Sequence, residues 1–265
     1  MIYKREVLKS QKSLWIWVIA LGGLILLMLS IYPEFAKQQD SIDQMMEAYP
    51  EAMIKAFNMD QFDFSTALSF YAIEGYLFVT LFGSIYVAIM AANMLVKEEG
   101  DKTIEFLLSK PVTRSRIVSE KLLAVFTNIV IFNIAIAVIN FIGFKIAGDQ
   151  SVDAKTFAII TLGPFLLHLT FAGLAFMASS FFRKNRMVVS FSLGLVLLTY
   201  FLDIVQGVSD KLENLKYITP FEYVDPAYLI QNLEIKPLYL AIMLVIIVLS
   251  TIVAYVIYHK KDITV

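Results

Sequence analysis

The sequence predicts an all-α polytopic membrane protein, a single transmembrane domain of six helices within residues 1–265. Hydrophobic residues make up 58% of the chain and charged residues 17%, whereas about a quarter of the residues of soluble domains are charged. The mean hydropathy of +0.71 agrees with this composition. Six apolar segments are long enough for a helix to cross a bilayer core of about 30 Å. Composition and segment length together indicate a multi-pass protein.

The six predicted spans cover residues 14–32, 71–96, 122–146, 157–182, 188–205 and 238–258. The second, third and fourth exceed the minimum length, which permits tilt or extension beyond the bilayer. A basic segment precedes the first span, as in a signal peptide. However, the apolar run is long, and Ser30 to Pro33 lack a small-residue cleavage pattern. We therefore expect the first span to remain in the protein.

Lysine and arginine are divided unequally between the two sides of this topology. Fifteen of them fall before the first span, in 97–121, in 183–186 and after the sixth span, and seven fall in the connections on the other side. Cytoplasmic segments retain an excess of these residues, so we expect both termini to be cytoplasmic. The first 13 residues fit either a helix on an anionic membrane surface or simple basic flanking.

Two outer connections, 33–69 and 206–237, are predicted to be partly ordered. The first carries Met53, Ala56 and Phe57 on one helical face after Pro50. The second contains the aromatic run YITPFEYVDPAYLI. Amphipathic aromatic segments of this kind are typical of the membrane interface.

The connection at 97–121 is a charged interruption between two long spans. It opens with acidic residues, which suit a helix N-terminus. Ile104, Leu107 and Leu108 follow at the spacing of one helix face. Pro111 stops this helix, and Thr113 can cap the next one. A short amphipathic helix held at a membrane surface is suited to docking against a partner.

The run EEGDKTIEFLLSKPVTRSRIVSEK resembles the loop between the second and third spans of ABC transporter permease subunits of the type-2 exporter class. That family has an acidic residue, a Gly/Thr group, Glu-x-Leu-Leu, Pro-x-x-Arg and a later lysine in this order. The matching residues are Glu98 or Glu99, Gly100, Thr103, Glu105, Leu107, Leu108, Pro111, Arg114 and Lys121. YPEAMIKAF and YITPFEYVDPAYLI are also similar to family elements, although Asn58-Met59 stands where many relatives carry a glycine.

The resemblance implies that the 97–121 loop forms a cytoplasmic coupling helix that seats in a groove of a separate ATP-binding subunit. The expected contacts are apolar packing by Ile104, Phe106, Leu107 and Leu108, polar contacts by Glu98, Glu99, Thr103, Glu105, Arg114 and Arg116, and a turn at Pro111. This chain is then expected to bind no cofactor, because ATP and Mg²⁺ belong to the partner ATPase. A second permease chain, identical or paralogous, would complete the exporter in a bacterial plasma membrane. The substrate pathway would lie between the two permeases, lined partly by their second and fifth spans.

Polar residues within or near the spans are the candidates for a substrate path. We include Glu74 and Asn93 of the second span, His168 of the fourth and Asp203 of the fifth. Hydrogen bonding to a neighbouring helix is the commoner role for a histidine in this position. The same explanation fits the three asparagines of the third span at positions 128, 133 and 140.

Catalytic functions find little support in the sequence. The chain has no cysteine and only two histidines, and it lacks an HExxH pattern. The residues needed for thiol catalysis or for a zinc protease are therefore missing from the sequence. Asp101 separates Gly100 from Lys102, unlike a phosphate-binding loop. We therefore expect neither an enzyme nor a nucleic-acid-binding protein.

The apolar spans, together with 14% aromatic residues, favour an amphipathic or hydrophobic cargo such as a peptide, drug or lipid. ABC-driven sodium extrusion is an alternative. A secondary transporter would need coupling-ion groups near the midplane, where His168 with Pro164 forms the one cluster that we identify. An intramembrane enzyme is the remaining alternative.

Overall fold

The computed structural model describes residues 2–37, 49–50, 54, 66–105, 112–148, 152–208 and 210–261. Within these ranges the chain is helical with no strand, and six helices are long and apolar enough to cross a membrane. The all-helical prediction with six candidate spans is confirmed. The elements are α1 (Ile2–Ala36), α4 (Ala67–Phe70), η2 (Tyr71–Gly75), α5 (Tyr76–Gly100), α7 (Arg114–Ala147), α8 (Ala154–Phe181), α9 (Asn185–Val208), η3 (Asp210–Tyr217), η4 (Glu222–Val224), α10 (Pro226–Asn232) and α11 (Pro237–Lys260).

Short polar residues define where several of these helices begin and end. The Thr113 hydroxyl accepts a hydrogen bond from the Arg116 backbone N–H at 3.3 Å, which caps α7 as predicted. Asp153 caps α8 in the same way through the Thr156 N–H at 2.7 Å, and hydrogen bonds from the side chain and the backbone of Thr156 lower the pKa of the Asp153 carboxyl. At the other end of α7, Gly148 adopts a φ of 74°, a left-handed conformation that glycine accommodates without strain.

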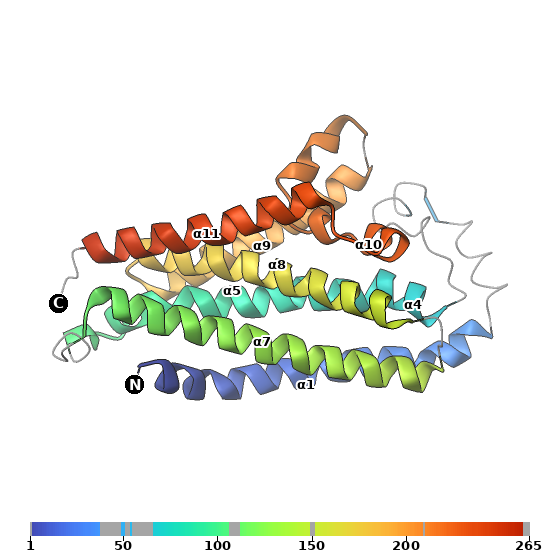
Figure 1. Ribbon diagram of the computed structural model, residues 1–265, viewed down its shortest axis with the longest axis horizontal. Helices are drawn as coiled ribbons and strands as arrows, with labels where there is room; N and C mark the ends of the chain where they lie inside the picture. The colour runs from blue at the N-terminus through green and yellow to red at the C-terminus, as the bar shows by residue number, and fades with distance from the viewer. Residues whose placement is uncertain are drawn as a thin grey trace.

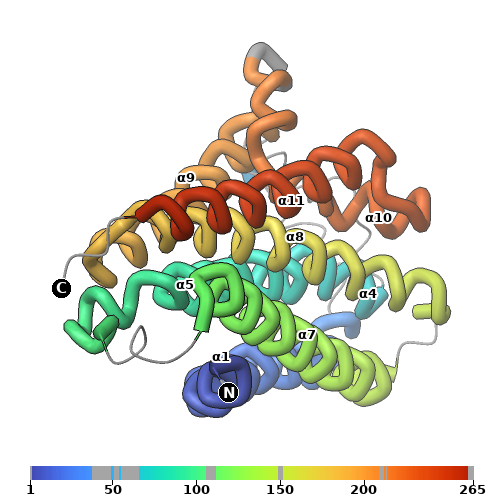
Figure 2. The backbone as a smooth tube through the Cα atoms, turned by 60° about the vertical axis from the view of Figure 1, so that its left-hand side comes forward, coloured from blue at the N-terminus to red at the C-terminus, as the bar shows by residue number. Residues whose placement is uncertain are grey.

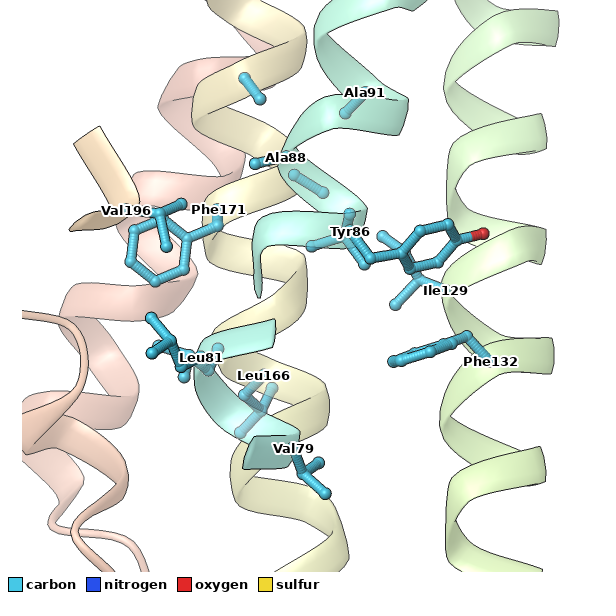
Figure 3. Packing of buried hydrophobic residues seen from close by; sticks show 14 of the residues in the cluster. Val79, Leu81, Tyr86, Ala88, Ala91, Ile129, Phe132, Leu166, Phe171 and Val196 are labelled. Carbon is cyan, nitrogen blue, oxygen red and sulfur yellow. The ribbon is translucent and has the colours of Figure 1, made fainter. Parts of the chain in front are cut away.

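The helix α5 occupies the centre of the bundle. In the most apolar part of this helix 72% of the residues are buried, against 22% for α9 and 17% for α11. Figure 3 shows Tyr86 of α5 directed towards Phe132 of α7, with ring centroids 4.9 Å apart. Phe171 of α8 and Val196 of α9 lie on the other side of α5 in the same view. The second predicted span is therefore surrounded by other helices along most of its length.

Small residues allow α5 and α8 to pack closely. Ala88 and Ala91 of α5 and Ala172 and Ala175 of α8 are all buried. The Ser179 hydroxyl of α8 accepts hydrogen bonds from two backbone N–H groups of α5, at 2.9 and 3.2 Å. Close backbone approach and hydroxyl bonds of this kind are typical of helix packing in membranes.

The helices α1 and α7 lie side by side along most of their length (Figures 1 and 2). The residues of α1 that are buried against the bundle recur at helical spacing, at Leu14, Val18, Leu21, Ile25 and Leu29. The helix continues without a break from Ile2 to Ala36, so its basic first turns extend directly into the first span. Both ends of the described chain lie at one end of the bundle (Figure 1).

The second outer connection folds back onto the bundle instead of lying only at a membrane interface. Tyr223 and Val224 are 3% and 1% exposed, and the Tyr76 hydroxyl of α5 donates to the Val224 carbonyl oxygen at 2.8 Å. Tyr217 and Ile218 remain exposed. The aromatic run thus divides between buried packing and an exposed edge, which its sequence pattern did not distinguish. Most of the 33–69 connection, including the predicted helix at Met53, Ala56 and Phe57, lies outside the described residues.

Candidate functional site

The candidate site lies at the end of the bundle that carries both chain termini. We call it the basic end and define it by residues 2–13, 97–105, 112–121, 182–186 and 258–261. Five segments contribute to it: the start of α1, the end of α5, the start of α7, the α8–α9 connection and the end of α11. The predicted coupling loop emerges from this end.

The helix α5 terminates in a compact hydrogen-bonded turn. The Thr103 N–H donates to the Glu98 carbonyl at 2.8 Å, and the Lys102 N–H donates to the Glu99 carbonyl at 3.2 Å. Lys102 has a φ of 54°, so the two bonds form a Schellman motif with a lysine in the left-handed position. This motif fixes the direction in which the chain leaves the bundle.

A buried ion pair joins this turn to α7. The Glu98 carboxylate pairs with the Lys121 ammonium group, and their side chains are 6% and 0% exposed. Lys121 also donates to the Met94 carbonyl of α5. Glu98 was expected to contact a partner subunit and Lys121 was noted only as part of the loop motif, and the structure brings the two together. Since an unpaired buried charge is strongly unfavourable, each of these groups holds the other in place.

The first turns of α1 extend the ion pair into a network. Arg5 pairs with Glu98 at 3.2 Å and with Glu6 at 2.9 Å. The Glu6 side chain is completely buried and pairs with Lys97 of α5. Glu6 was not among the residues predicted to function, although a single acidic residue within a basic segment could have indicated it.

A second set of contacts attaches α11 to the same end. Glu99 forms an ion pair with Lys261 at 2.8 Å, with both side chains less than a tenth exposed. Lys261 also donates to the Phe182 carbonyl at 2.7 Å. Arg114 donates to the carbonyls of His259 and Lys261, at 3.0 and 2.7 Å. A cation at the C-terminal end of a helix stabilises its unpaired carbonyl groups.

The remaining predicted coupling residues divide between exposed and buried positions. Thr103 and Glu105 are exposed, whereas Ile104 is 2% exposed and belongs to the core. Arg116 is exposed and pairs with Glu120 at 2.8 Å. The predicted residues Phe106, Leu107, Leu108 and Pro111 lie outside the described residues.

A pocket of about 530 Å³ opens beside this turn. Its lining residues come from the end of α5 with the following turn and from the α8–α9 connection: Glu99, Gly100, Lys102, Ile104, Glu105, Arg183 and Lys184. A Cβ atom at Gly100 would lie 2.9 Å from the Asn185 Oδ1 atom, so the two connections approach each other closely. The pocket therefore combines one buried aliphatic residue with charged groups of both signs.

The four expected substrate-path residues are not gathered at one site. Glu74 is exposed in η2, whereas Asn93 is half-buried near the other end of α5 and lines a pocket of about 220 Å³ between α1 and α5. Asp203 of α9 accepts from the Thr219 hydroxyl at 3.4 Å. Glu222 lies near this carboxylate, and burial, together with Asp225, raises the pKa of Glu222.

The fourth candidate, His168, is completely buried in the bundle. Its Nε2 donates to the Val79 carbonyl at 3.1 Å, and its Nδ1 lies 3.0 Å from Asn133 Oδ1. Gly83 of α5 faces the ring so closely that a Cβ atom there would overlap it. The other two asparagines of α7 also bond between helices, Asn128 with Ser10 and Asn140 with Tyr71, as expected for polar groups in spans.

One face of α5 is less covered than the rest of the helix. Its incompletely buried residues include Phe78, Phe82, Ile85, Ile89 and Asn93, which recur at steps of three or four, and Glu74 of the preceding η2 continues this series. Phe78 and Phe82 stack with centroids 5.9 Å apart. Two of the expected path residues, Glu74 and Asn93, thus share one mostly apolar face.

Comparison with known families agrees with this geometry. The family model described as ABC-2 family transporter protein matches residues 1–263. The chain therefore belongs to the ABC-2 family, and it is a multi-pass membrane permease subunit of an ABC transporter. Permeases of this family normally work with an ATPase subunit. The comparison with curated proteins found no match.

Proposed function

We propose that this permease is driven by a separate ATPase subunit that docks at the basic end, and that it exports an amphipathic or hydrophobic substrate. Fifteen of the 22 lysine and arginine residues belong to this side of the topology, which supports a cytoplasmic position for both termini. The observation that carries the proposal is the buried network of Glu6, Lys97, Glu98 and Lys121 at the base of the coupling loop.

The network supports a transmission role for a physical reason. Removing one partner of a buried ion pair destabilises a protein by about 3–5 kcal/mol. The turn after α5 therefore does not swing independently of α5, α7 and the first turns of α1. Displacement of the loop by an ATPase subunit is then transferred to the central helix of the bundle.

The proposed cargo follows from the open face of α5 and the exposed surface of α9. Phe191, Leu198 and Phe201 of α9 are each more than half exposed. Apolar helix faces that span the membrane suit a peptide, drug or lipid that is itself partly apolar. Two permease chains would enclose this surface, and His168 is assigned to packing instead of substrate contact.

Copurification tests the docking part of the proposal. Glu105 is exposed beside the 530 Å³ pocket, so Glu105→Lys should reduce recovery of the coexpressed ATPase subunit with the tagged permease. Glu34→Lys changes an exposed carboxylate at the opposite end of the bundle and should leave recovery unchanged. Equal recovery with both variants and with Leu107→Asp would reject docking at this loop.

A further inference from the structure

A groove of about 470 Å³ lies between α7 and α11, with α8 as its floor. Leu122 and Phe126 of α7 form part of one wall, and Ile247 of α11 forms part of the other. Ala172 and Gly173 of α8 lie between them. The volume is within the range of about 300–1,000 Å³ typical of small-molecule sites. These residues lie within the candidate spans, so the groove faces the hydrocarbon part of the membrane.

Gly173 lines the floor of the groove without contributing a side chain. A Cβ atom there would be 3.6 Å from the Ser250 Cβ and 3.7 Å from the Ile247 Cα, which are ordinary contact distances. A side chain introduced at this position would therefore begin at the floor of the groove, in ordinary contact with α11. Leu123 and Phe126 remain 52% and 47% exposed along the α7 wall.

The end of the groove nearest the basic end is polar. The Ser119 and Tyr255 hydroxyl groups form a hydrogen bond of 2.7 Å across it. Arg116 lies three residues before Ser119 on α7, and His259 lies four residues after Tyr255 on α11. Each therefore shares a helix face with its hydroxyl residue and lies one turn closer to the basic end. Both are exposed; 61% of the Arg116 side chain is accessible although its Nε pairs with Glu120. The groove is thus apolar along its length and basic at its mouth.

We propose that this groove binds an anionic phospholipid, with one acyl chain along α8 and the phosphate group at Arg116 and His259. Basic pockets between transmembrane helices are recognised sites for anionic headgroups. The hydroxyl groups of Ser119 and Tyr255 supply hydrogen-bond partners at the level where the chain meets the glycerol region. This charge complementarity favours a lipid over an apolar face of a second protein chain. The proposal does not depend on export or on the docking of an ATPase.

Lipid retention measures the acyl-chain part of this site. The purified full chain is reconstituted in nanodiscs of phosphatidylcholine with one-fifth phosphatidylglycerol, extracted in mild detergent and analysed by native mass spectrometry. We expect the wild-type chain to retain phosphatidylglycerol and Gly173→Leu, whose side chain fills the groove, to lose it. Gly194→Leu is the matched control, because Gly194 is exposed on α9 with no atom within 4 Å of an added Cβ.

A second pair of variants measures the headgroup part. Arg116→Gln should lower the preference for phosphatidylglycerol over phosphatidylcholine by about fivefold. Arg186→Gln, an exposed arginine at the same end on α9, should leave it unchanged. The proposal is overturned if Gly173→Leu retains as much phosphatidylglycerol as the wild type and Arg116→Gln keeps the wild-type preference for phosphatidylglycerol over phosphatidylcholine. A Gly173→Leu chain that retains the lipid but changes its oligomeric state also overturns it, since the groove would then be a protein interface.

Discussion

At the scale of single residues, the charges of the basic end have partners that their sequence positions do not reveal. Glu98 and Lys121 are 23 positions apart, and Glu6 and Lys97 are 91 apart. Local pattern identified the loop and several of its polar residues, because charge and spacing are properties of a short segment. The direction of each side chain depends on how α1, α5 and α7 pack. The sequence therefore indicated contacts with a partner for Glu98, whereas the structure places this side chain inside the chain's own network.

Replacement of Glu98 tests the energetic importance of the network. Glu98→Gln leaves Lys121 buried without its carboxylate, and we expect the free energy of unfolding to fall by about 3 kcal/mol. Lys37→Gln is the control, since Lys37 and Glu34 form an exposed pair and the change should be under about 1 kcal/mol. Unfolding is measured by titration of the detergent-solubilised protein with SDS. An equal, small effect of both substitutions would show that the Glu98–Lys121 pair contributes little.

At the scale of the helices, the predicted spans correspond to long helices because apolar length is a local property of the sequence. Thr113 as the cap of α7 was predictable for the same reason. Three features were not predictable from local sequence: the continuous helix that begins at Ala67, the π-helical turn at 71–75, and the return of the aromatic run onto the bundle. The last of these features depends on contacts between distant segments, such as the Tyr76–Val224 hydrogen bond.

The pairing of α1 with α7 is predicted to persist through the transport cycle. The Ser10 hydroxyl donates to Asn128 Oδ1 at 2.9 Å, and Tyr3 donates its backbone N–H to Glu120 at 3.0 Å. The sequence has no cysteine, so Ser10→Cys with Asn128→Cys introduces the only thiols. A short bifunctional thiol-reactive reagent, such as a bis-methanethiosulfonate, should cross-link them equally well with and without ATP in the assembled transporter.

Exposed Lys12 provides the control for this cross-link. Lys12→Cys with Asn128→Cys should react more slowly, because Lys12 is exposed two residues along α1 from Ser10 and therefore lies on roughly the opposite side of the helix. The yield is read from the mobility of the chain on a denaturing gel. A large loss of the Ser10–Asn128 product upon ATP binding would mean that α1 slides along α7.

At the scale of the whole molecule, α5 is the central helix of the bundle. Its end lies in the charged network, and one of its faces is mostly apolar and less covered than the others. The continuous helix of residues 67–100 carries Glu74 on that face and Glu98 in the network, and the 97–121 connection begins at its end. Fold class and family were accessible from the sequence, because six apolar segments and one loop motif determine them. The central position of α5 was not, since it follows from which helix faces pack together. In the proposed mechanism, this helix carries movement from the loop to its less covered face.

The most direct measurement is the distance between the two α5 helices of the assembled transporter. A spin label is attached at Glu74→Cys, because Glu74 is exposed and the chain has no other cysteine. The label reports this distance in a transporter with two copies of the chain. We predict that ATP changes the distance in the otherwise unaltered protein, and that Leu107→Asp with Leu108→Asp abolishes the change while the ATPase subunit still hydrolyses ATP. An ATP-dependent change of the same size in the loop variant, or none in the unaltered protein, would contradict the account.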